Sequence, residues 1–402
     1  MKALILAAGE GLRCRPLTLT RSKVMLPVAN KPILEYIIRA LAQNEIKDII
    51  LVVGYKKERI MDYFGDGIGF GVNINYVEQE GQLGTAHAIK LAKPFADEKF
   101  LVLNGDNLVD HGTIADLLAG ASGDITLLTV VREQTAGYGV VLQDKGRISK
   151  VIEKPREKIS HLVNTGIYMF PFSIFDEIDK TSISETGEYA ITDTIQRIID
   201  QGEKVTHVTT HSTWIDAVHS WDLIKANTIL LGKFEDMENK GVVEKGAIIV
   251  GDVAVGKNSI IRSGSYIVGP VIIGENCDIG PSVTILPSTA IGDNCRVGSF
   301  TELENSIIMY DARIGTGSFI SNSIIGAHNI ISPHFCTDVG KDLKIEMKGI
   351  LHLADELGTV IGDNNIIGLS VLVKAGKMIA TGCSVGSGVK ITKDIPQDST
   401  VL

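Results

Sequence analysis

Glycines and basic residues after the first apolar segment have types and spacing that suit phosphate groups. Leu4, Ile5 and Leu6 form a short apolar run, as a buried parallel strand does before a glycine loop. Glycine lets the backbone approach a ligand and turn several N–H groups toward one anion, and basic side chains add positive charge. The loop residues concerned are Ala7, Ala8, Gly9, Gly11, Arg13 and Lys23. The segment therefore predicts a polyphosphate-binding loop.

Two common phosphate-binding patterns do not fit this segment. No Lys-Ser or Lys-Thr pair follows the second glycine, so it is not a P-loop. Arg13 and Cys14 stand where the third glycine of GxGxxG would be. From these residues alone, an ordinary strand-to-helix turn explains the segment equally well.

Further polar residues follow other predicted strands, where ligands bind in mostly parallel sheets. Asp106 ends the run KFLVLNGDN, and Asp216 follows an apolar run in WIDAV. A carboxylate in such a place is either a helix cap or a metal ligand. The segment EQEGQLGTAHA contains Gln79, Gly84 and Thr85, and its simplest interpretation is a helix N-cap.

Three later segments contain residues that are unremarkable when each is taken alone. GYGVV supplies Gly139, IEKP supplies Glu153 and Lys154, and NTGIYMF supplies Asn164 and Thr165. A hairpin glycine, a surface ion pair on a strand and a loop asparagine would account for them. Their order along the chain, together with the earlier segments, is what carries information.

Taken in order, these segments resemble the motifs of the sugar-1-phosphate nucleotidyltransferases. AAGEGLRCRPLT followed by RSKVMLPV resembles the GxGxRxxP…PK signature of that family, with Ser22 in place of the usual proline before the lysine. NGDN is similar to the family's GD(D/N) motif, and GYGVV, IEKP and NTGIYMF follow in the family's order. The resemblance covers residues 1 to about 230.

The resemblance implies a reaction and a role for each charged residue. The implied reaction is magnesium-dependent transfer of a nucleotidyl group from UTP or dTTP to glucose-1-phosphate or N-acetylglucosamine-1-phosphate, which releases pyrophosphate and forms a nucleotide sugar. Arg13 would stabilise the leaving pyrophosphate, Lys23 the phosphates at the reacting centre, and Lys154 the attacking sugar phosphate. Asp106 and Asp216 would hold the Mg²⁺ that offsets repulsion between the two anions.

The resemblance also implies two groups of uncharged contacts. The Gln79 amide would pair with a pyrimidine base, because an amide offers a donor and an acceptor together, as uracil and thymine require. The nucleotide would contact Ala7, Ala8, Gly9, Gly11, Gly84 and Thr85. The sugar would contact Gly139, Glu153, Asn164 and Thr165.

The elements that must position these residues alternate along the first part of the chain. Strand-like runs are expected at 2–8, 48–54, 72–78, 99–105, 124–131 and 162–170. Helical patterns are expected at 32–44, 56–64, 84–92, 171–178, 188–201 and 219–231. Such alternation predicts an α/β fold, a Rossmann-like, mostly parallel sheet with helices on both faces.

The second half of the chain shows a repeat of six residues. Aliphatic residues recur at every sixth position from Val243 to Leu303, and again from Ile361 to Ile391, with register slips near Ile308 and Ile325. This period is typical of a left-handed parallel β-helix of hexapeptide repeats, a triangular prism. We therefore predict three segments: a nucleotidyltransferase domain at 1–231, a linker at 232–242 and a β-helix domain at 243–402.

A longer period of eighteen residues predicts columns of side chains on successive coils. These are Gly256, Gly274 and Gly292; Asn258, Asn276 and Asn294; and Cys277 and Cys295. The glycines and asparagines are expected to take unusual backbone angles at corners, and the two cysteines to stack as free thiols. An interruption at 332–360, which includes KDLKIEMK, predicts a loop extending from the prism.

Two alternative functions remain open at this point. A nucleotidyltransferase followed by such a prism resembles bifunctional enzymes that also acetylate amino-sugar phosphates with acetyl-CoA. The catalytic histidine and tyrosine of that family align here with Thr316 and Phe319, and its sugar-binding arginine with Leu286, although His328 and His334 lie nearby. The second alternative is a noncatalytic regulatory subunit of the same architecture, as in translation-initiation exchange factors, which tend to lose the charged signature residues.

Composition excludes several other classes. A net charge of −9 over 402 residues argues against a nucleic-acid partner. No apolar run reaches membrane length, and the first one is too short for a signal peptide. Five cysteines without a CxxC spacing argue against a disulfide framework or a zinc site. We expect a soluble cytoplasmic homo-oligomer, a trimer by analogy with similar prisms.

Overall fold

A computed structural model of the chain describes residues 1–144, 146–155, 157–184, 187–234, 238–347 and 349–402. It divides into two compact units. The first unit contains Met1–Glu10 and Ile33–Asp216, and the second contains Gly11–Pro32 and Ala217–Leu402. The loop after the first strand therefore belongs with the repeat in this division. The predicted domain limits stay a prediction, and part of the predicted linker, residues 235–237, lies outside the described residues.

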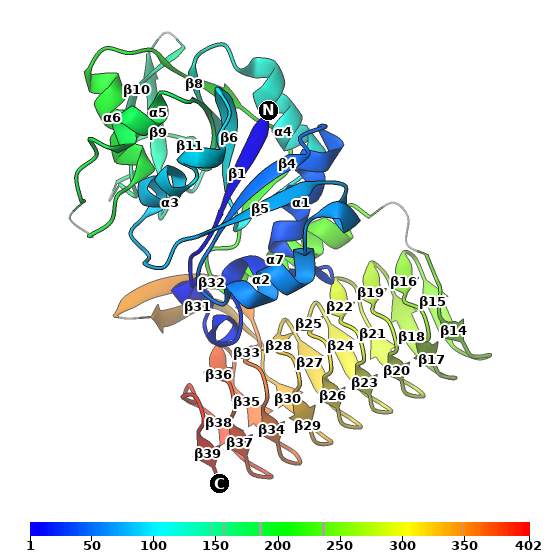
Figure 1. The fold of residues 1–402 in the computed structure, drawn as a ribbon. Helices are drawn as coiled ribbons and strands as arrows, with labels where there is room; N and C mark the ends of the chain where they lie inside the picture. Colours follow the sequence, from blue (N-terminus) through cyan, green and yellow to red (C-terminus); the bar gives the residue numbers. More distant parts are fainter. Residues whose placement is uncertain (145, 156, 185–186, 235–237, 348) are drawn as a thin grey trace. The chain divides into compact units, whose positions relative to one another are not determined.

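The first unit is built on a mixed nine-stranded sheet (Figure 1). Its main path runs β10-β9-β11-β6-β1-β4-β5, and β8 pairs with β11 and with β12. The strands are β1 Lys2–Ala7, β4 Asp48–Val53, β5 Asn73–Glu78, β6 Lys99–Asn104, β8 Ile125–Val131, β9 Val140–Asp144, β10 Arg147–Ile152, β11 Leu162–Pro171 and β12 Val205–Thr209. A separate two-stranded sheet joins β7 Asn107–Val109 to β13 Trp214–Asp216.

Parallel pairing brings the ends of four strands to one edge of this sheet. Ala7 at the end of β1 is in register with Val53 at the end of β4, and Val53 is in register with Glu78 at the end of β5. On the other side of β1, Leu6 is in register with Asn104 at the end of β6. The residues that follow these strands therefore gather at the carboxyl edge, as predicted.

Helices pack on both faces of the sheet because successive strand residues point to opposite sides. Leu4, Val52 and Val102 share one buried cluster with the apolar sides of α3, α5 and α6, while α1 contacts β7 and α4 contacts β8 and β12. The helices of this unit are α1 Ile33–Gln43, α2 Lys57–Phe64, α3 Thr85–Leu91, α4 His111–Gly120, α5 Ile174–Ile178 and α6 Ile191–Asp200. The predicted α/β fold is confirmed.

The predicted elements were right in type, but the list was incomplete. Helix α4 was missed because its apolar residues do not gather on one clear face; of its residues only Thr113, Ile114 and Leu117 are buried. Its start does carry a capping signal, since the Asp110 carboxylate accepts a hydrogen bond from the Thr113 amide at 3.1 Å. Strands β7, β9, β10, β12 and β13 were also missed; most are short and lie outside long apolar runs.

The second unit contains three parallel sheets that form the sides of the prism (Figure 1). One sheet comprises β14 Val242–Val243, β17 Ile260–Ile261, β20 Asp278–Ile279, β23 Arg296–Val297, β26 Arg313–Ile314, β29 Ile330–Ile331, β34 Ile366–Ile367, β37 Ser384–Val385 and β39 Thr400–Val401. The next comprises β15 Ile248–Val250, β18 Tyr266–Val268, β21 Thr284–Ile285, β24 Glu302–Glu304, β27 Phe319–Ser321, β30 Cys336–Thr337, β35 Leu372–Val373 and β38 Lys390–Ile391. The third comprises β16 Val253–Val255, β19 Val271–Ile273, β22 Thr289–Ile291, β25 Ile307–Ile308, β28 Ile324–Ile325, β33 Thr359–Ile361 and β36 Lys377–Ile379.

The same unit includes short elements from the loop after β1 and one helix. They are the 3-10 turns Leu12–Cys14, Leu17–Leu19 and Lys23–Met25, the paired strands β2 Pro27–Val28 and β3 Lys31–Pro32, and helix α7 Asp222–Leu231. We call residues 11–32 the signature loop and residues 243–402 the prism. Together with α7 they belong to one compact unit.

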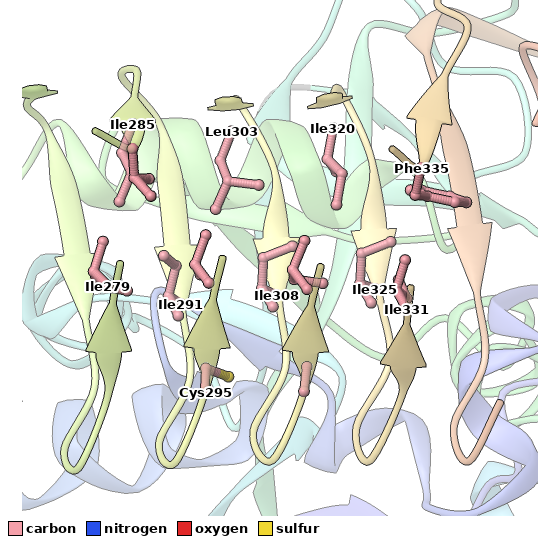
Figure 2. Packing of buried hydrophobic residues seen from close by; sticks show 14 of the residues in the cluster. Ile279, Ile285, Ile291, Cys295, Leu303, Ile308, Ile320, Ile325, Ile331 and Phe335 are labelled. Carbon is pink, nitrogen blue, oxygen red and sulfur yellow. The ribbon is translucent and has the colours of Figure 1, made fainter. Parts of the chain in front are cut away.

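The inward side chains of the prism form one continuous apolar core. Figure 2 shows Ile285, Leu303 and Ile320 stacked on successive coils, and all three are fully buried. The predicted slips are one-residue shortenings, because Ile291 pairs with Ile308 and Ile308 with Ile325. The left-handed β-helix is confirmed.

The predicted columns exist, but their glycines serve a different purpose. Asn258, Asn276 and Asn294 take positive φ values of 60°, 56° and 59°, as expected for corner residues. The glycine column is needed for space instead, because a Cβ on Gly256 would lie 2.4 Å from the carbonyl oxygen of Gly274 on the next coil. The expectation of unusual backbone angles was therefore wrong for the glycines and right for the asparagines.

The cysteine column consists of buried free thiols, as predicted. The Cys277 thiol donates to the Gly292 carbonyl and the Cys295 thiol to the Met309 carbonyl, each at 3.1 Å. The hydrogen bond with Cys277, and then burial, raise the pKa of the Cys295 thiol. Cys295 therefore remains protonated at neutral pH.

The interruption of the repeat is an antiparallel hairpin, shorter than predicted. Strands β31 Gly340–Met347 and β32 Ile350–Leu357 pair with each other between β30 and β33. Residues 332–337 still form a coil of the β-helix, since Phe335 is buried in its core and Thr337 pairs with Val373 of the next coil. Lys348, at the end of KDLKIEMK, lies outside the described residues.

Replacing Ile291 with alanine tests whether this core stabilises the prism. Ile291 is fully buried, and such a truncation lowers the free energy of unfolding by about 2–5 kcal/mol. The control is Ile248→Ala, because Ile248 is 55% exposed and its loss should change stability by no more than about 0.5 kcal/mol. Urea unfolding of both variants measures the difference; equal stabilities would contradict the packing described.

Candidate active site

The carboxyl edge of the sheet brings together residues from three strand ends. Gly54 follows β4, and a Cβ on it would lie 3.0 Å from the Cβ of Ala8 and 2.8 Å from the carbonyl oxygen of Gln79. The Tyr55 amide donates to the Ala8 carbonyl at 3.1 Å. The structure therefore brings Ala8 and the main chain of Gln79 to opposite sides of the same glycine, Gly54.

Gln79 is directly bonded to the loop that follows β5. Its side-chain nitrogen donates to the Gly84 carbonyl at 3.2 Å and lies 3.0 Å from Nδ1 of His87. The side chain is buried, so these bonds fix the plane of the amide. His87 was not singled out from the sequence, although it lies in the same segment, GTAHA.

Gly84 and Thr85 have clear local reasons for their identity. Gly84 has a φ of 99°, and a Cβ on it would lie 2.5 Å from the Tyr189 carbonyl oxygen. The Thr85 hydroxyl accepts a hydrogen bond from the Ile191 amide at 2.9 Å. The loop is thus held against the start of α6 from two sides.

The two predicted metal ligands occupy neighbouring positions. Asp106 lies in the turn between β6 and β7, where the Gly105 amide donates to the Leu6 carbonyl at 2.8 Å. Asp216 ends β13 and is in register with Asn107 of β7. Pairing of β7 with β13 therefore brings Asp216 next to the residue that follows Asp106.

This pair of carboxylates fits a divalent ion that also binds substrate phosphate. Mg²⁺ commonly takes one or two carboxylates and completes its octahedron with phosphate and water oxygens. Among the described residues, no cluster of three or more His, Cys, Asp or Glu side chains could hold a metal by itself. The donor set fits a shared magnesium site rather than a closed structural metal site.

The predicted sugar contacts form a third cluster. The Asn164 amide donates to the Gly139 carbonyl at 2.9 Å, and a Cβ on Gly139 would lie 2.9 Å from Oε2 of Glu153. The Asn164 side chain donates to the Tyr168 hydroxyl at 2.8 Å. Burial raises the pKa of Tyr168, and the Glu153 carboxylate adds to this. Tyr168 therefore stays protonated and can orient Asn164; its role was not foreseen because a shift in strand register between them brings the two together.

Lys154 has an uncommon backbone conformation. It follows β10 with a φ of 43°, and its ammonium group lies 3.0 Å from the Glu153 carboxylate. Residues other than glycine seldom take positive φ, and such residues concentrate at functional sites. Lys154 thus presents a half-exposed ammonium group just beyond the carboxyl end of β10.

Thr165 lies in β11 and is bonded to residues of β7 and β13, the two strands beside the carboxylate pair. Its carbonyl accepts hydrogen bonds from the Asn107 side chain at 3.0 Å and from the Trp214 indole at 3.2 Å. Its hydroxyl donates to the Leu128 carbonyl at 2.8 Å, and the side chain is only 2% exposed. The structure thus shows a supporting position for Thr165, and its predicted contact with sugar stays a prediction.

The predicted phosphate residues of the signature loop are described within the second unit. Gly11 has a φ of 76°, and a Cβ on it would lie 2.5 Å from the Cβ of Lys23. The Thr18 hydroxyl donates to the Gly11 carbonyl at 3.0 Å. The structure therefore brings Gly11 and Lys23 together, with Lys23 buried and Arg13 exposed. Their placement against Asp106 and Asp216 stays a prediction.

A substitution at Gly84 tests the geometry of the loop after β5. Gly84→Ala forces a side chain into the left-handed region and against Tyr189, which should lower the free energy of unfolding by about 1–3 kcal/mol and raise KM for the nucleoside triphosphate. Gly81→Ala is the control, because the nearest atom to a Cβ there is 3.6 Å away. Thermal unfolding and steady-state kinetics check both; a Gly84→Ala protein that matches Gly81→Ala would contradict the argument.

An α/β sheet with this order of motifs is typical of enzymes that transfer nucleotidyl groups. The chain belongs to the nucleotidyl transferase family, whose description matches residues 2–232, more than half of the protein. Residues 267–401 match a second family, described as the GMPPB C-terminal domain. The protein is a sugar-1-phosphate nucleotidyltransferase, as predicted. Its substrates are a nucleoside triphosphate and a sugar-1-phosphate, and enzymes of this family typically use a divalent metal.

Several proteins are similar to this chain over all or part of its length. Proteins named "Bifunctional protein GlmU" from Methanocaldococcus jannaschii and Methanococcus maripaludis are 37% and 41% identical, covering all of this chain and 97% of theirs. A glucose-1-phosphate thymidylyltransferase from Streptomyces antibioticus is 36% identical over 64% of this chain and 74% of its own length. A solved structure from Bacillus anthracis, 28% identical, superposes with a TM-score of 0.53 over 59% of this chain and 98% of that chain.

These similarities support an enzyme rather than the noncatalytic regulatory subunit considered above. The charged residues of the family's motifs are all retained: Arg13, Lys23, Asp106, Lys154 and Asp216.

Among the described residues, no helix is both long and apolar enough to cross a membrane.

Proposed function

We propose that the protein transfers a nucleotidyl group from UTP or dTTP to glucose-1-phosphate or N-acetylglucosamine-1-phosphate, with Mg²⁺ as cofactor. The observation that carries the proposal is the pairing of β7 with β13, which sets Asp216 beside Asn107 and Asp106. Gln79, bonded to the Gly84 carbonyl, supports a pyrimidine base. Uracil and thymine differ by one methyl group, which needs only a little apolar space.

In the proposed reaction the protein positions two anions and contributes no nucleophile. A sugar phosphate oxygen attacks the α-phosphorus in line, and pyrophosphate leaves. Arg13 stabilises the pyrophosphate, Lys23 binds phosphate oxygens at the reacting centre, and Lys154 orients the sugar phosphate. Asp106 and Asp216 hold the magnesium, which when bound offsets the repulsion between the two substrates.

The remaining predicted contacts divide between the two substrates. Gly9 and Gly11 offer backbone amides to phosphate, while Gly139, Glu153 and Asn164 offer polar groups to sugar hydroxyls. The cluster that these three residues form with Tyr168 supports the sugar assignment, because their polar atoms are already held in a fixed arrangement. Thr165, next to Asn164, connects β11 to β7 and β13, because its carbonyl accepts hydrogen bonds from the Asn107 and Trp214 side chains.

We also propose the predicted organisation of the chain: 1–231, 232–242 and 243–402, assembled as a homotrimer through the prism in the cytoplasm. Ile330 and Ile366 are 46% and 58% exposed and in register on neighbouring coils, which supports an apolar contact between copies. All five cysteines are free, as expected of a reducing compartment.

Pyrophosphate release by the purified full chain tests the proposed reaction. UTP, dTTP, GTP, CTP and ATP are paired with glucose-, N-acetylglucosamine-, glucosamine- and mannose-1-phosphate. We expect one pyrimidine nucleotide to be preferred, a chelator to stop release, and Mg²⁺ to restore it. Asp106→Asn should lower kcat/KM by about a hundredfold or more, whereas Asp124→Asn, at an exposed position before β8, should not. Release by Asp106→Asn at the normal rate would refute the metal assignment.

A second candidate activity is acetyl transfer to an amino-sugar-1-phosphate, and two observations favour it. Relatives named as bifunctional proteins align over the whole chain. The prism carries a cavity of about 630 Å³ that contains the Lys374–Asp338 ion pair, Phe319 and Cys336. Neither of the predicted substitute histidines is among the described residues that line it; His328 lies instead 3.4 Å from Asp311.

Labelled acetyl-CoA with glucosamine-1-phosphate tests this second activity. Incorporation of label into the sugar phosphate that falls in Lys374→Ala, while pyrophosphate release persists, would place acetyl transfer in the prism cavity. If no label enters the sugar phosphate, acetyl transfer is refuted and nucleotidyl transfer remains as the single proposed activity.

A further inference from the structure

A buried ion pair joins the signature loop to the prism. Arg21 lies two residues before Lys23, and Asp363 follows β33. The Arg21 guanidinium donates to the Asp363 carboxylate, and the two side chains are 2% and 1% exposed. Both belong to the same compact unit, although 342 positions separate them in the chain.

Each partner of this pair makes further contacts. The Oδ2 atom of Asp363, which binds Arg21, also accepts a hydrogen bond from the Thr20 hydroxyl at 2.5 Å. Its other oxygen, Oδ1, accepts one from the Ala327 amide at 2.8 Å. Arg21 donates to the Met309 sulfur at 3.5 Å, and its guanidinium carbon lies 5.4 Å from the centre of the Tyr310 ring. Two coils of the prism therefore contact Arg21 directly, and the coil between them holds Asp363 through the Ala327 amide.

Comparison of Asp363 with the equivalent positions on other coils shows that the prism does not need a buried ion pair at this place. The equivalent places on other coils hold Lys257, Glu275, Asp293, Tyr310, Ala327 and Thr381. Asp293 makes the same main-chain bond as Asp363, accepting from the Glu275 amide at 2.7 Å, yet it is exposed. A buried ion pair usually gains little stability over apolar packing, because both charges lose their hydration. The Arg21–Asp363 pair is therefore better explained by a role in fixing the conformation of the signature loop than by a gain in prism stability.

A second anchor lies at the far end of the same loop. The Asn30 side chain donates to the Ile291 carbonyl at 2.6 Å. The Ala29 amide donates to the Asn227 side chain at 2.9 Å, and that side chain donates to the Ser288 carbonyl at 2.7 Å. Lys23 therefore lies between two points at which the loop is bonded to prism residues.

We propose that Asp363 is a positioning residue for nucleotidyl transfer: by holding Arg21 it sets the direction of the Ser22–Lys23 segment, and with it the phosphate-binding ammonium group. This inference rests on the role of Lys23 in the proposed function. It makes one coil of the prism part of the machinery that binds the nucleoside triphosphate. Asp363 touches no substrate in this scheme and acts only through Arg21.

Two matched variants of the full chain test the proposal. Asp363→Asn removes the charge and keeps an oxygen for the Ala327 amide, and Asp293→Asn makes the same change at the equivalent exposed position. We expect Asp363→Asn to raise KM for the nucleoside triphosphate and lower kcat/KM by about tenfold to a hundredfold, as misplacing a distant support can do. Asp293→Asn should match the wild type. A loss of folded protein alone would lower the apparent kcat and leave KM unchanged.

Amide hydrogen exchange gives a readout that does not depend on turnover. In Asp363→Asn the amides of residues 17–26 should exchange faster, while those of the coils at 253–297 keep their protection. If Asp363→Asn does not fold, Thr20→Val, which removes a single hydrogen bond to Asp363, replaces it and should show a smaller change of the same kind.

The outcomes separate this inference from the proposed function. An unchanged KM together with unchanged exchange in residues 17–26 would overturn the positioning role of Asp363. If the wild type releases no pyrophosphate from any substrate pair, the proposed function fails. Exchange in residues 17–26 then decides alone whether Asp363 anchors the loop.

Discussion

Hydrogen bonding between parallel strands is the constraint on which both units of this protein depend. In the first unit, it aligns the ends of β1, β4, β5 and β6, so that residues far apart in the chain meet at one edge. In the second, it stacks each coil on the next, so that one inward residue per side builds a continuous core. Parallel strands need long connections. In the sheet these connections contain most of the predicted site residues, and in the prism they form the corners.

The prism was predictable in detail because its geometry follows from a sequence repeat of six residues. One aliphatic residue in six points inward, and an asparagine at positive φ marks a corner every eighteen residues, as at Asn258 and Asn276. The antiparallel hairpin was seen only as an interruption, since nothing in KDLKIEMK shows that its partner follows at Ile350–Leu357. The helix α4 was invisible for a related reason: its packing depends on neighbours rather than on its own pattern.

The candidate site was predictable in its residue types but not in its supports. Motif order pointed to Gln79, Asp106 and Asn164; the first two follow a strand, and Asn164 lies near the start of β11. The groups that hold them, such as His87 against Gln79 and Tyr168 against Asn164, depend on turn geometry and strand register. Arg21 and Asp363 carry no local signal at all, since an arginine in a basic loop and an aspartate on a coil are ordinary residues. Only the folded chain shows that they are paired.

The stacking of coils also has a consequence for heat. A solenoid is a nearly one-dimensional array in which each repeat is stabilised mainly by its neighbours, so its ends loosen before its middle. The last strand, β39, pairs with β37 alone, and Asp363 lies on a coil close to that end, bonded through its amide to Thr381 on the next coil. Melting that begins at the final coils would therefore release Arg21 of the signature loop before the middle of the prism unfolds. At high temperature the final coils would then limit how long the signature loop keeps its conformation, although they lie far from it in the sequence.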